Sequence, residues 1–210
     1  MADNYEYIKR FIPFAESELS VDSKGDVQVI HGYAAKFNVV SGNMFKRASG
    51  RSEMIRTGFF RDALALDEPI LCLFNHDENY ILGERDAGTL VVDEDKIGLP
   101  FEAKIPDGPI IRELVVGPIV RKETKGCSFS AFYDENLVEY DRKSGVLHLM
   151  PGGAKQIPDV GPVTHPAFTS TEVYARSVVI FERAKRKANP REASEQIYHE
   201  FQMQKIRNRG

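Results

Sequence analysis

Short hydrophobic runs separated by turn residues dominate the chain from residue 8 to residue 164. Apolar and polar positions alternate in several of these runs, a period typical of strands. Clusters of Gly, Asp, Asn and Ser between the runs supply turn chemistry. The predicted strands cover residues 8–14, 27–37, 69–74, 81–83, 89–92, 99–105, 126–133, 138–141, 146–150 and 160–164. We expect the first two to pair as a hairpin, with Gly32 marking a bulge or a close backbone approach.

Only two short helices are predicted within this series of strands. Residues 59–65 place Phe60 and Leu64 on one helical face, and residues 110–119 carry an apolar stripe that Pro118 should kink or end. Many short strands with few helices indicate a mainly β fold with peripheral helices (α+β). We expect a closed or partly open β-barrel.

The pattern divides the chain into one domain and a tail. Residues 1–177 are predicted to form the β-barrel domain, with a polar surface loop at 41–52. Residues 178–210 form a basic C-terminal tail that we expect to be flexible or weakly helical. From residue 182 onward there are eight Lys or Arg and four Glu, whereas the whole chain has a formal net charge of -3. The tail is therefore a basic appendage on an acidic body.

Length, charge and cysteine content limit the classes of protein to which this chain can belong. With 210 residues, 42% of them hydrophobic, the chain is long enough to bury a core. Its net charge argues against a general nucleic-acid binder, and the basic cluster 183–187 is more typical of a solvated charge run. We expect no signal peptide and no membrane span. Two cysteines, Cys72 and Cys127, favour a reduced compartment rather than a disulfide framework.

The predicted strand 126–133 carries two hydroxyl groups within an apolar run. Alternation places Ser128 and Ser130 on one face and turns Cys127 toward the other, where a buried core thiol is expected. A serine hydroxyl becomes a nucleophile when an imidazole lies within hydrogen-bond reach and a third group fixes that imidazole. Strand pattern alone does not choose between the two serines.

Among the five histidines, His76 has the position most suited to catalysis. It follows directly on the most apolar predicted strand, at the start of a loop, and loops held by strands are where catalytic side chains concentrate. Candidates for the third group are Asp159, His165 and Asp77. The run from His76 to Glu78 also allows a metal-dependent hydrolase, although no second ligand cluster accompanies it.

In the order of its segments, the chain resembles the prohead maturation serine proteases of tailed bacteriophages, which are related to the herpesvirus assemblins. One of the matching segments is Phe-Asn-His-Asp, and another is the Ser-Phe pair that begins at Ser128. The segments are Gly32–Asn38, Glu53–Phe60, Leu73–Asp77 with Leu82–Gly83, Gly98–Ala103, Cys127–Ser130 and Asp159–Ala167. Each is weak alone, but six in the family's order are specific together.

The resemblance implies a catalytic role for three residues. It makes Ser128 the nucleophile, His76 the general base and Asp159 the acid that orients the histidine. The family usually has glutamate at the position of Asp159 and glycine at that of Ser130, so Ser130 remains an alternative nucleophile. Assemblins use a second histidine as third member, which keeps His165 as an alternative.

Gly152 and Gly153, in the loop expected before Asp159, are candidate oxyanion donors because their backbone N–H groups are unhindered. The implied activity is that of a serine endopeptidase without a metal or other cofactor. Its expected substrates are the major capsid protein precursor, the scaffolding segment and the chain itself, inside the immature capsid in the host bacterial cytoplasm. The competing hypothesis is a non-catalytic β-barrel scaffold or interaction protein of the prohead.

Overall fold

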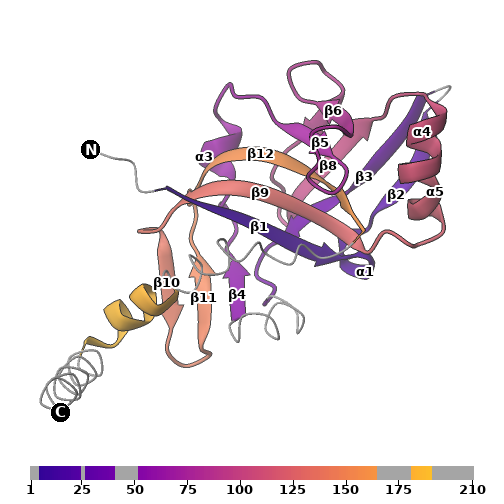
Figure 1. Cartoon of the computed structure of the whole chain (residues 1–210). Coiled ribbons are helices and arrows are strands. Elements are labelled where there is room, and N and C mark those ends of the chain that lie inside the picture. The colour runs from indigo at the N-terminus through magenta and orange to yellow at the C-terminus, as the bar shows by residue number, and fades with distance from the viewer. Residues whose placement is uncertain (1–4, 25–26, 41–51, 165–180, 191–210) are drawn as a thin grey trace, which may run out of the picture.

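Strands arranged in three sheets make up most of the regular secondary structure in the computed structural model (Figure 1), which describes residues 5–24, 27–40, 52–164 and 181–190. The strands are β1 Tyr5–Pro13, β2 Ser20–Lys24, β3 Val27–Lys36, β4 Ser52–Ile55, β5 Leu71–Leu73, β6 Ile81–Glu84, β7 Leu90–Val92, β8 Gly98–Lys104, β9 Gly126–Asp134, β10 Val138–Asp141, β11 Val146–Leu149 and β12 Ala154–Val163. The helices are α1 Phe14–Ser17, α3 Arg61–Leu64, α4 Pro109–Ile111 and α5 Gly117–Val120, with a π-helix, η1, at Arg112–Val116.

The first sheet has the order β1-β9-β12-β5-β6 and is mostly antiparallel, with β12 and β5 parallel. The second has the order β2-β3-β8-β7, and the third the order β10-β11-β4. The mainly β fold class is confirmed. A closed barrel is not, because the described strands form three separate sheets rather than one continuous ring.

The predicted hairpin between the first two strands is wrong. β1 pairs antiparallel with β9, more than 110 residues further along the chain, with Tyr5 opposite Asp134 and Pro13 opposite Gly126. β3 instead pairs with β2, which its polar sequence, Ser-Val-Asp-Ser-Lys, did not reveal. Gly32 is a point of close approach as expected, since a Cβ there would lie 3.0 Å from the carbonyl oxygen of Ser17.

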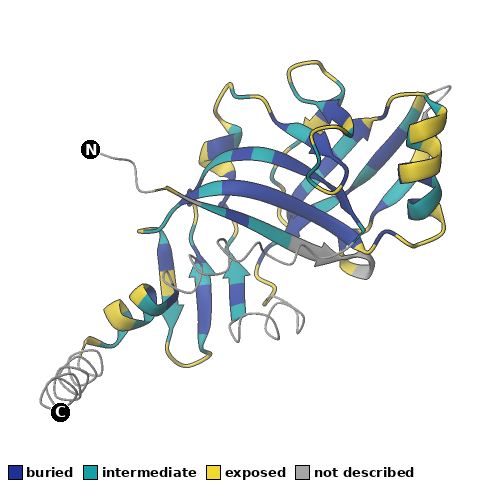
Figure 2. Cartoon of the chain, viewed as in Figure 1, coloured by how far each residue is buried: buried dark blue, intermediate teal, exposed yellow. Residues whose placement is uncertain are grey.

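Phe129 of β9 belongs to the hydrophobic core, and β9 is buried along most of its length (Figure 2). Phe129 packs edge-on against Phe60, with ring centroids 5.0 Å apart, and Phe60 packs in the same way on Phe59. Phe59 and Phe60 directly precede α3, so the packing of these two rings in the core anchors the start of this short helix. Glu94 accepts a hydrogen bond from the backbone N–H of Phe60, and burial raises the pKa of this carboxyl group.

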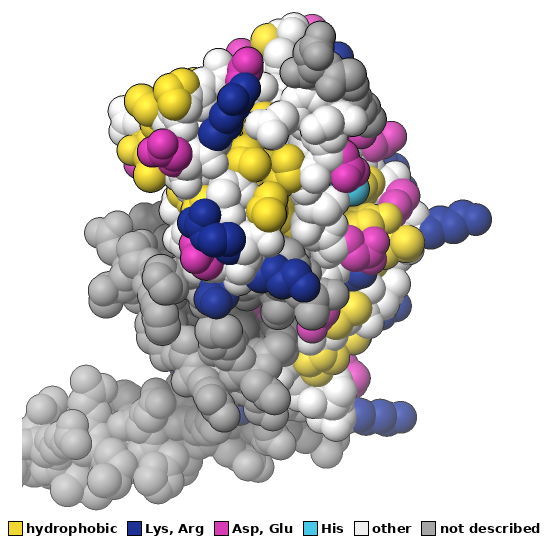
Figure 3. Space-filling model, turned by 90° about the vertical axis from the view of Figure 1, so that its right-hand side faces the viewer, with side chains coloured by type: hydrophobic (Ala, Val, Ile, Leu, Met, Phe, Trp, Pro, Cys, Tyr) yellow, Lys and Arg dark blue, Asp and Glu magenta, His cyan; other side chains and the backbone are white. Residues whose placement is uncertain are grey.

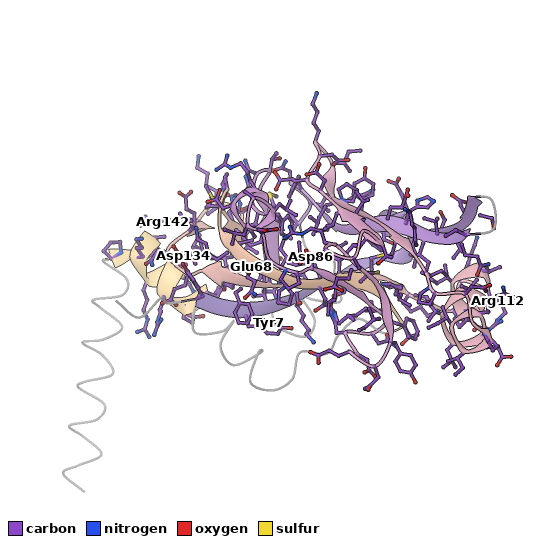
Figure 4. All side chains as sticks on the ribbon, turned by 90° about the horizontal axis from the view of Figure 1, so that it is seen from above. Tyr7, Glu68, Asp86, Arg112, Asp134 and Arg142 are labelled. Carbon is purple, nitrogen blue, oxygen red and sulfur yellow. The ribbon has the colours of Figure 1, made fainter. Side chains whose placement is uncertain are left out.

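The helical segment from Pro109 to Val120 runs through Pro118 without stopping. The turn before the proline is a π-helix, in which the N–H of Gly117 donates to the carbonyl oxygen of Arg112. The segment lies at one end of the molecule and the β10–β11 hairpin at the other, as Arg112 and Arg142 show in Figure 4. Its outer side exposes Ile110, Leu114 and Val120, on a face where hydrophobic and charged side chains are mixed (Figure 3).

The described part of the predicted tail, residues 181–190, contacts the third sheet and the turn before it. Residues 181–188 are helical; Phe181 contacts the ring of Tyr140 edge-on, and Arg183 pairs with Glu135. The proposed boundary at residue 177, the predicted loop 41–52 except Ser52 and the last twenty residues lie outside the described part. Within the described ranges, no helix is both long and apolar enough to cross a membrane.

β12 lies between β9 and β5 and is longer than the predicted strand 160–164. Gly161 is opposite Ser128 on β9, and β5 passes so close that a Cβ on Gly161 would lie 2.1 Å from the carbonyl oxygen of Leu73. The close backbone of β5 therefore requires glycine at this position of β12.

Gly161→Ala should reduce the free energy of unfolding by about 2 to 3 kcal/mol, because the added methyl group forces β12 and β5 apart. Urea denaturation of the purified protein measures the change. Gly108→Ala is the matched control, since nothing lies within 4 Å of a Cβ there, and it should change stability by less than about 0.5 kcal/mol. Equal stability of the two variants would contradict the close approach.

Candidate active site

Ser128 lies in the middle of β9 and is completely buried. Its neighbours on the two sides are Phe11 of β1 and Gly161 of β12. Ser130 is also buried, and both serine hydroxyls point to the same face of the strand, as alternation predicted. Phe129, between them, points into the core.

His76 reaches this face from the loop that follows β5. Asn75 and His76 both have a φ of 58°, in the left-handed region that residues other than glycine adopt uncommonly, although asparagine and histidine adopt it more often than most. The loop is tied to the end of β12: the N–H of Asn75 donates to the carbonyl oxygen of Pro162, and its side-chain oxygen accepts from the N–H and hydroxyl of Thr164. These bonds hold the backbone that directs the imidazole.

The three side chains that the resemblance assigned form one chain of hydrogen bonds. Nε2 of His76 lies 2.7 Å from Oγ of Ser128, and Nδ1 lies 2.5 Å from Oδ1 of Asp159. The histidine and aspartate side chains are only 6% and 7% exposed. An imidazole between a hydroxyl and a buried carboxylate has the geometry of a serine nucleophile, a general base and an orienting acid.

Ser130 has a different partner from Ser128. Its hydroxyl donates to Oδ2, the second carboxylate oxygen of Asp159, so His76 and Ser130 hold the two oxygens from separate sides. The Asp159 carboxylate therefore lies between the Ser130 hydroxyl and the His76 imidazole and separates the two. The two serines, equivalent in the strand pattern, are distinguished by these contacts.

The other candidate residues have different outcomes. The N–H of Gly152 donates to the carbonyl oxygen of Gly58, and that of Gly153 donates to Met150. Gly153 is also next to Ala154, which pairs with Tyr133, five residues along β9 from Ser128 and thus about 16 Å away. These two glycines are therefore too far from the serine, and already bonded, to serve as oxyanion donors.

Asp77 closes its own turn by accepting hydrogen bonds from the N–H and amide of Asn79. His76 has both ring nitrogens engaged by Asp159 and Ser128. Within the described residues, no group of three or more His, Cys, Asp or Glu side chains is placed to hold a metal ion. His165 lies outside the described residues.

Both cysteines are buried thiols. Burial raises the pKa of Cys127 to about 12, and burial also raises the pKa of Cys72 well above its ordinary value. A thiol that stays protonated in the core is a poor nucleophile at neutral pH. The expectation that Cys127 faces away from Ser128 and serves the core is confirmed.

Sequence reasoning missed two residues that touch the site. Asn75 stands in the Phe-Asn-His-Asp segment and tolerates a left-handed backbone, which was the one available signal. Arg10 had no signal, because its contribution is a backbone carbonyl oxygen that accepts a hydrogen bond of 2.8 Å from the Ser128 hydroxyl. Only the pairing of β1 with β9 brings it there.

A buried serine, histidine and aspartate hydrogen-bonded in series on a mainly β scaffold define the class of site found in serine hydrolases. A family model described as caudovirus prohead serine protease matches residues 16–185, and the chain belongs to this family. The chain is also similar to a solved structure, the bacteriophage T4 capsid assembly protease gp21, with a TM-score of 0.49 and 11% identity over 78% of this chain and 99% of that one. No curated protein matches the chain.

Iodoacetamide at pH 8 should leave both cysteines of the folded protein unmodified, since the buried thiols remain protonated. Intact-mass spectrometry gives the number of adducts, and the same reaction in concentrated urea should add two. Rapid labelling of the folded protein, or loss of peptidase activity with it, would show that a thiol belongs to an accessible site.

Proposed function

We propose that this protein is a serine endopeptidase of prohead maturation in which Ser128 is the nucleophile, His76 the general base and Asp159 the orienting acid. The observation that carries the proposal is the continuous hydrogen-bonded series from the Ser128 hydroxyl through His76 to the buried Asp159 carboxylate. Membership of a serine protease family agrees with this chemistry.

In the proposed reaction, His76 takes the proton of Ser128 through Nε2 as Oγ attacks the carbonyl carbon of the scissile peptide bond. The Asp159 carboxylate, bonded to Nδ1–H, stabilises the imidazolium that forms. The imidazolium then gives its proton to the leaving amine. A water molecule, deprotonated by the same histidine, hydrolyses the acyl-enzyme and restores the serine.

The second oxygen of Asp159 needs a donor of its own because the carboxylate is buried. Ser130 supplies it, which fixes the plane of the carboxylate and hence the direction of the imidazole. Ser130 is therefore a positioning residue in this proposal, not a second nucleophile. The same bond holds in place the aspartate that this chain has where the family usually has glutamate.

The proposed substrates are the major capsid protein precursor with its scaffolding segment and the protease chain itself. The family description places these serine proteases in the prohead of tailed phages. Cleavage inside an immature capsid, assembled in the host cytoplasm, would remove internal scaffold after it has guided assembly.

Ser128→Ala should abolish cleavage of the capsid precursor, because no other hydroxyl lies against His76 among the described contacts. Ser130→Ala should retain cleavage at a rate lowered by roughly tenfold, since it loses only the bond that positions Asp159. Electrophoresis of the precursor fragments over time compares the variants. Activity kept in Ser128→Ala and lost in Ser130→Ala would reverse the assignment, and absence of cleavage by wild-type protein even at high precursor concentration would favour the non-catalytic scaffold.

Asp159→Asn should lower kcat by about 10³-fold to 10⁴-fold with little change in folding, because an amide stabilises the wrong tautomer of His76. The matched substitution His165→Ala tests the alternative third member. Rates on one peptide, with thermal melts for both proteins, separate catalysis from stability. A nearly normal Asp159→Asn enzyme beside an inactive His165→Ala enzyme would move the third role to His165.

A further inference from the structure

β1 covers the side of β9 nearest to the nucleophile. It is the edge strand of the first sheet and pairs with β9 along its whole length, so β9 would itself be the edge without it. The family match begins at residue 16, after β1 has ended. An exposed strand edge beside a nucleophile is a surface on which an extended peptide binds by adding a strand.

Arg10 of β1 is placed as a substrate residue would be. Its carbonyl oxygen accepts a hydrogen bond of 2.8 Å from Oγ of Ser128, so the carbonyl group of Arg10 lies directly beside the nucleophile. Its side chain leaves the other face of the strand, where Nε donates to Oε2 of Glu53 at 2.7 Å. The two side chains of this ion pair are 10% and 5% exposed.

The bond to Arg10 also affects the resting nucleophile. Ser128 has one hydroxyl proton and two acceptors within reach, the Arg10 carbonyl oxygen and Nε2 of His76. A hydroxyl that donates to the carbonyl does not donate to the base. Ser128 is fully buried, so a peptide reaches it only after β1 has moved.

We propose that β1 occupies the substrate-binding edge of β9, and that Glu53 is the specificity residue that binds a basic side chain, arginine before lysine, on the amino side of the scissile bond. This inference rests on the proposed function and deepens it. Arg10 is the built-in occupant of the same subsite. A peptide that replaces β1 places its own basic residue on Glu53.

The preference follows from the burial of Glu53. A carboxylate that is 5% exposed needs a cation and hydrogen-bond donors when Arg10 leaves, and an arginine of the substrate supplies both. A neutral glutamine does not replace the cation that Arg10 supplies, and a glutamate adds a like charge. Lysine carries the charge but lacks the planar donor group that Arg10 presents.

Glu53→Gln tests the specificity with two fluorogenic peptides that differ only in arginine or glutamine before the scissile bond. Full-length wild-type protein should prefer arginine by roughly 30-fold in kcat/KM, and Glu53→Gln should reduce that ratio to below about threefold. Glu139→Gln, an exposed carboxylate in the same three-stranded sheet, is the matched control and should keep the wild-type ratio.

The ratio is informative because a purely structural ion pair would lower both rates together and leave the preference unchanged. A wild-type enzyme without preference for arginine, or an unchanged ratio in folded Glu53→Gln, overturns the inference while the proposed function stands. If neither peptide is cleaved by wild type or by the β1 variants below, the proposed function fails, and this inference fails with it.

Arg10→Gln tests the occupancy by β1. It removes the cation that anchors β1 on Glu53, so kcat/KM for the arginine peptide should rise at least fivefold. Lys9→Gln makes the same change of charge on the neighbouring residue and should stay within twofold of wild type. A rate for folded Arg10→Gln at or below that of wild type would show that β1 does not compete with substrate.

Discussion

The position of β12 between β9 and β5 is the constraint on which the site depends. Asp159 is opposite Ser130 on β9 and beside Leu71 on β5. Two residues further on, Gly161 is opposite Ser128 and touches the backbone at Leu73. β12 therefore carries Asp159 itself. It also fixes Ser128 through its pairing with β9, and His76 through its pairing with β5. A shift of register by one residue would turn Asp159 to the opposite face, away from both serines.

Burial makes this backbone arrangement chemically demanding. A carboxylate removed from water needs a donor for each oxygen, and Asp159 receives one from His76 and one from Ser130. The histidine in turn depends on a left-handed turn that Asn75 ties to the end of β12. Backbone register, hydrogen-bond satisfaction and loop conformation thus select the same orientation of the imidazole, and the loss of any one loosens the other two.

Local pattern was sufficient for the features that depend on alternation. The strand around Ser128, the shared face of Ser128 and Ser130 and the inward Cys127 follow from a period of two. Choosing Ser128, His76 and Asp159 required the resemblance, because their proximity arises from pairing between distant strands. The same non-local pairing explains the wrong hairpin, since alternation shows that residues 8–14 form a strand but not which strand they join.

Other features lacked a sequence signal for a different reason. β12 contains Pro158, Gly161 and Pro162, residues that usually interrupt strands, and its full length depends on neighbours that accept them. The oxyanion prediction failed because unhindered N–H groups of Gly152 and Gly153 had already found acceptors within the fold. A backbone group shows its availability only when its neighbours are known.

The proposed competition between β1 and substrate makes cleavage depend on the local concentration of substrate. A peptide that replaces β1 on β9 exchanges one set of ladder hydrogen bonds for an equivalent set, so the net gain is small. β1 is attached to the domain, and a tethered segment has an effective concentration on the order of millimolar. A dilute peptide at micromolar concentration therefore competes poorly, whereas the scaffold segments proposed as substrates would reach, inside a capsid, concentrations comparable to that of the tethered strand. Confinement itself would then open the site, without a separate activating ligand.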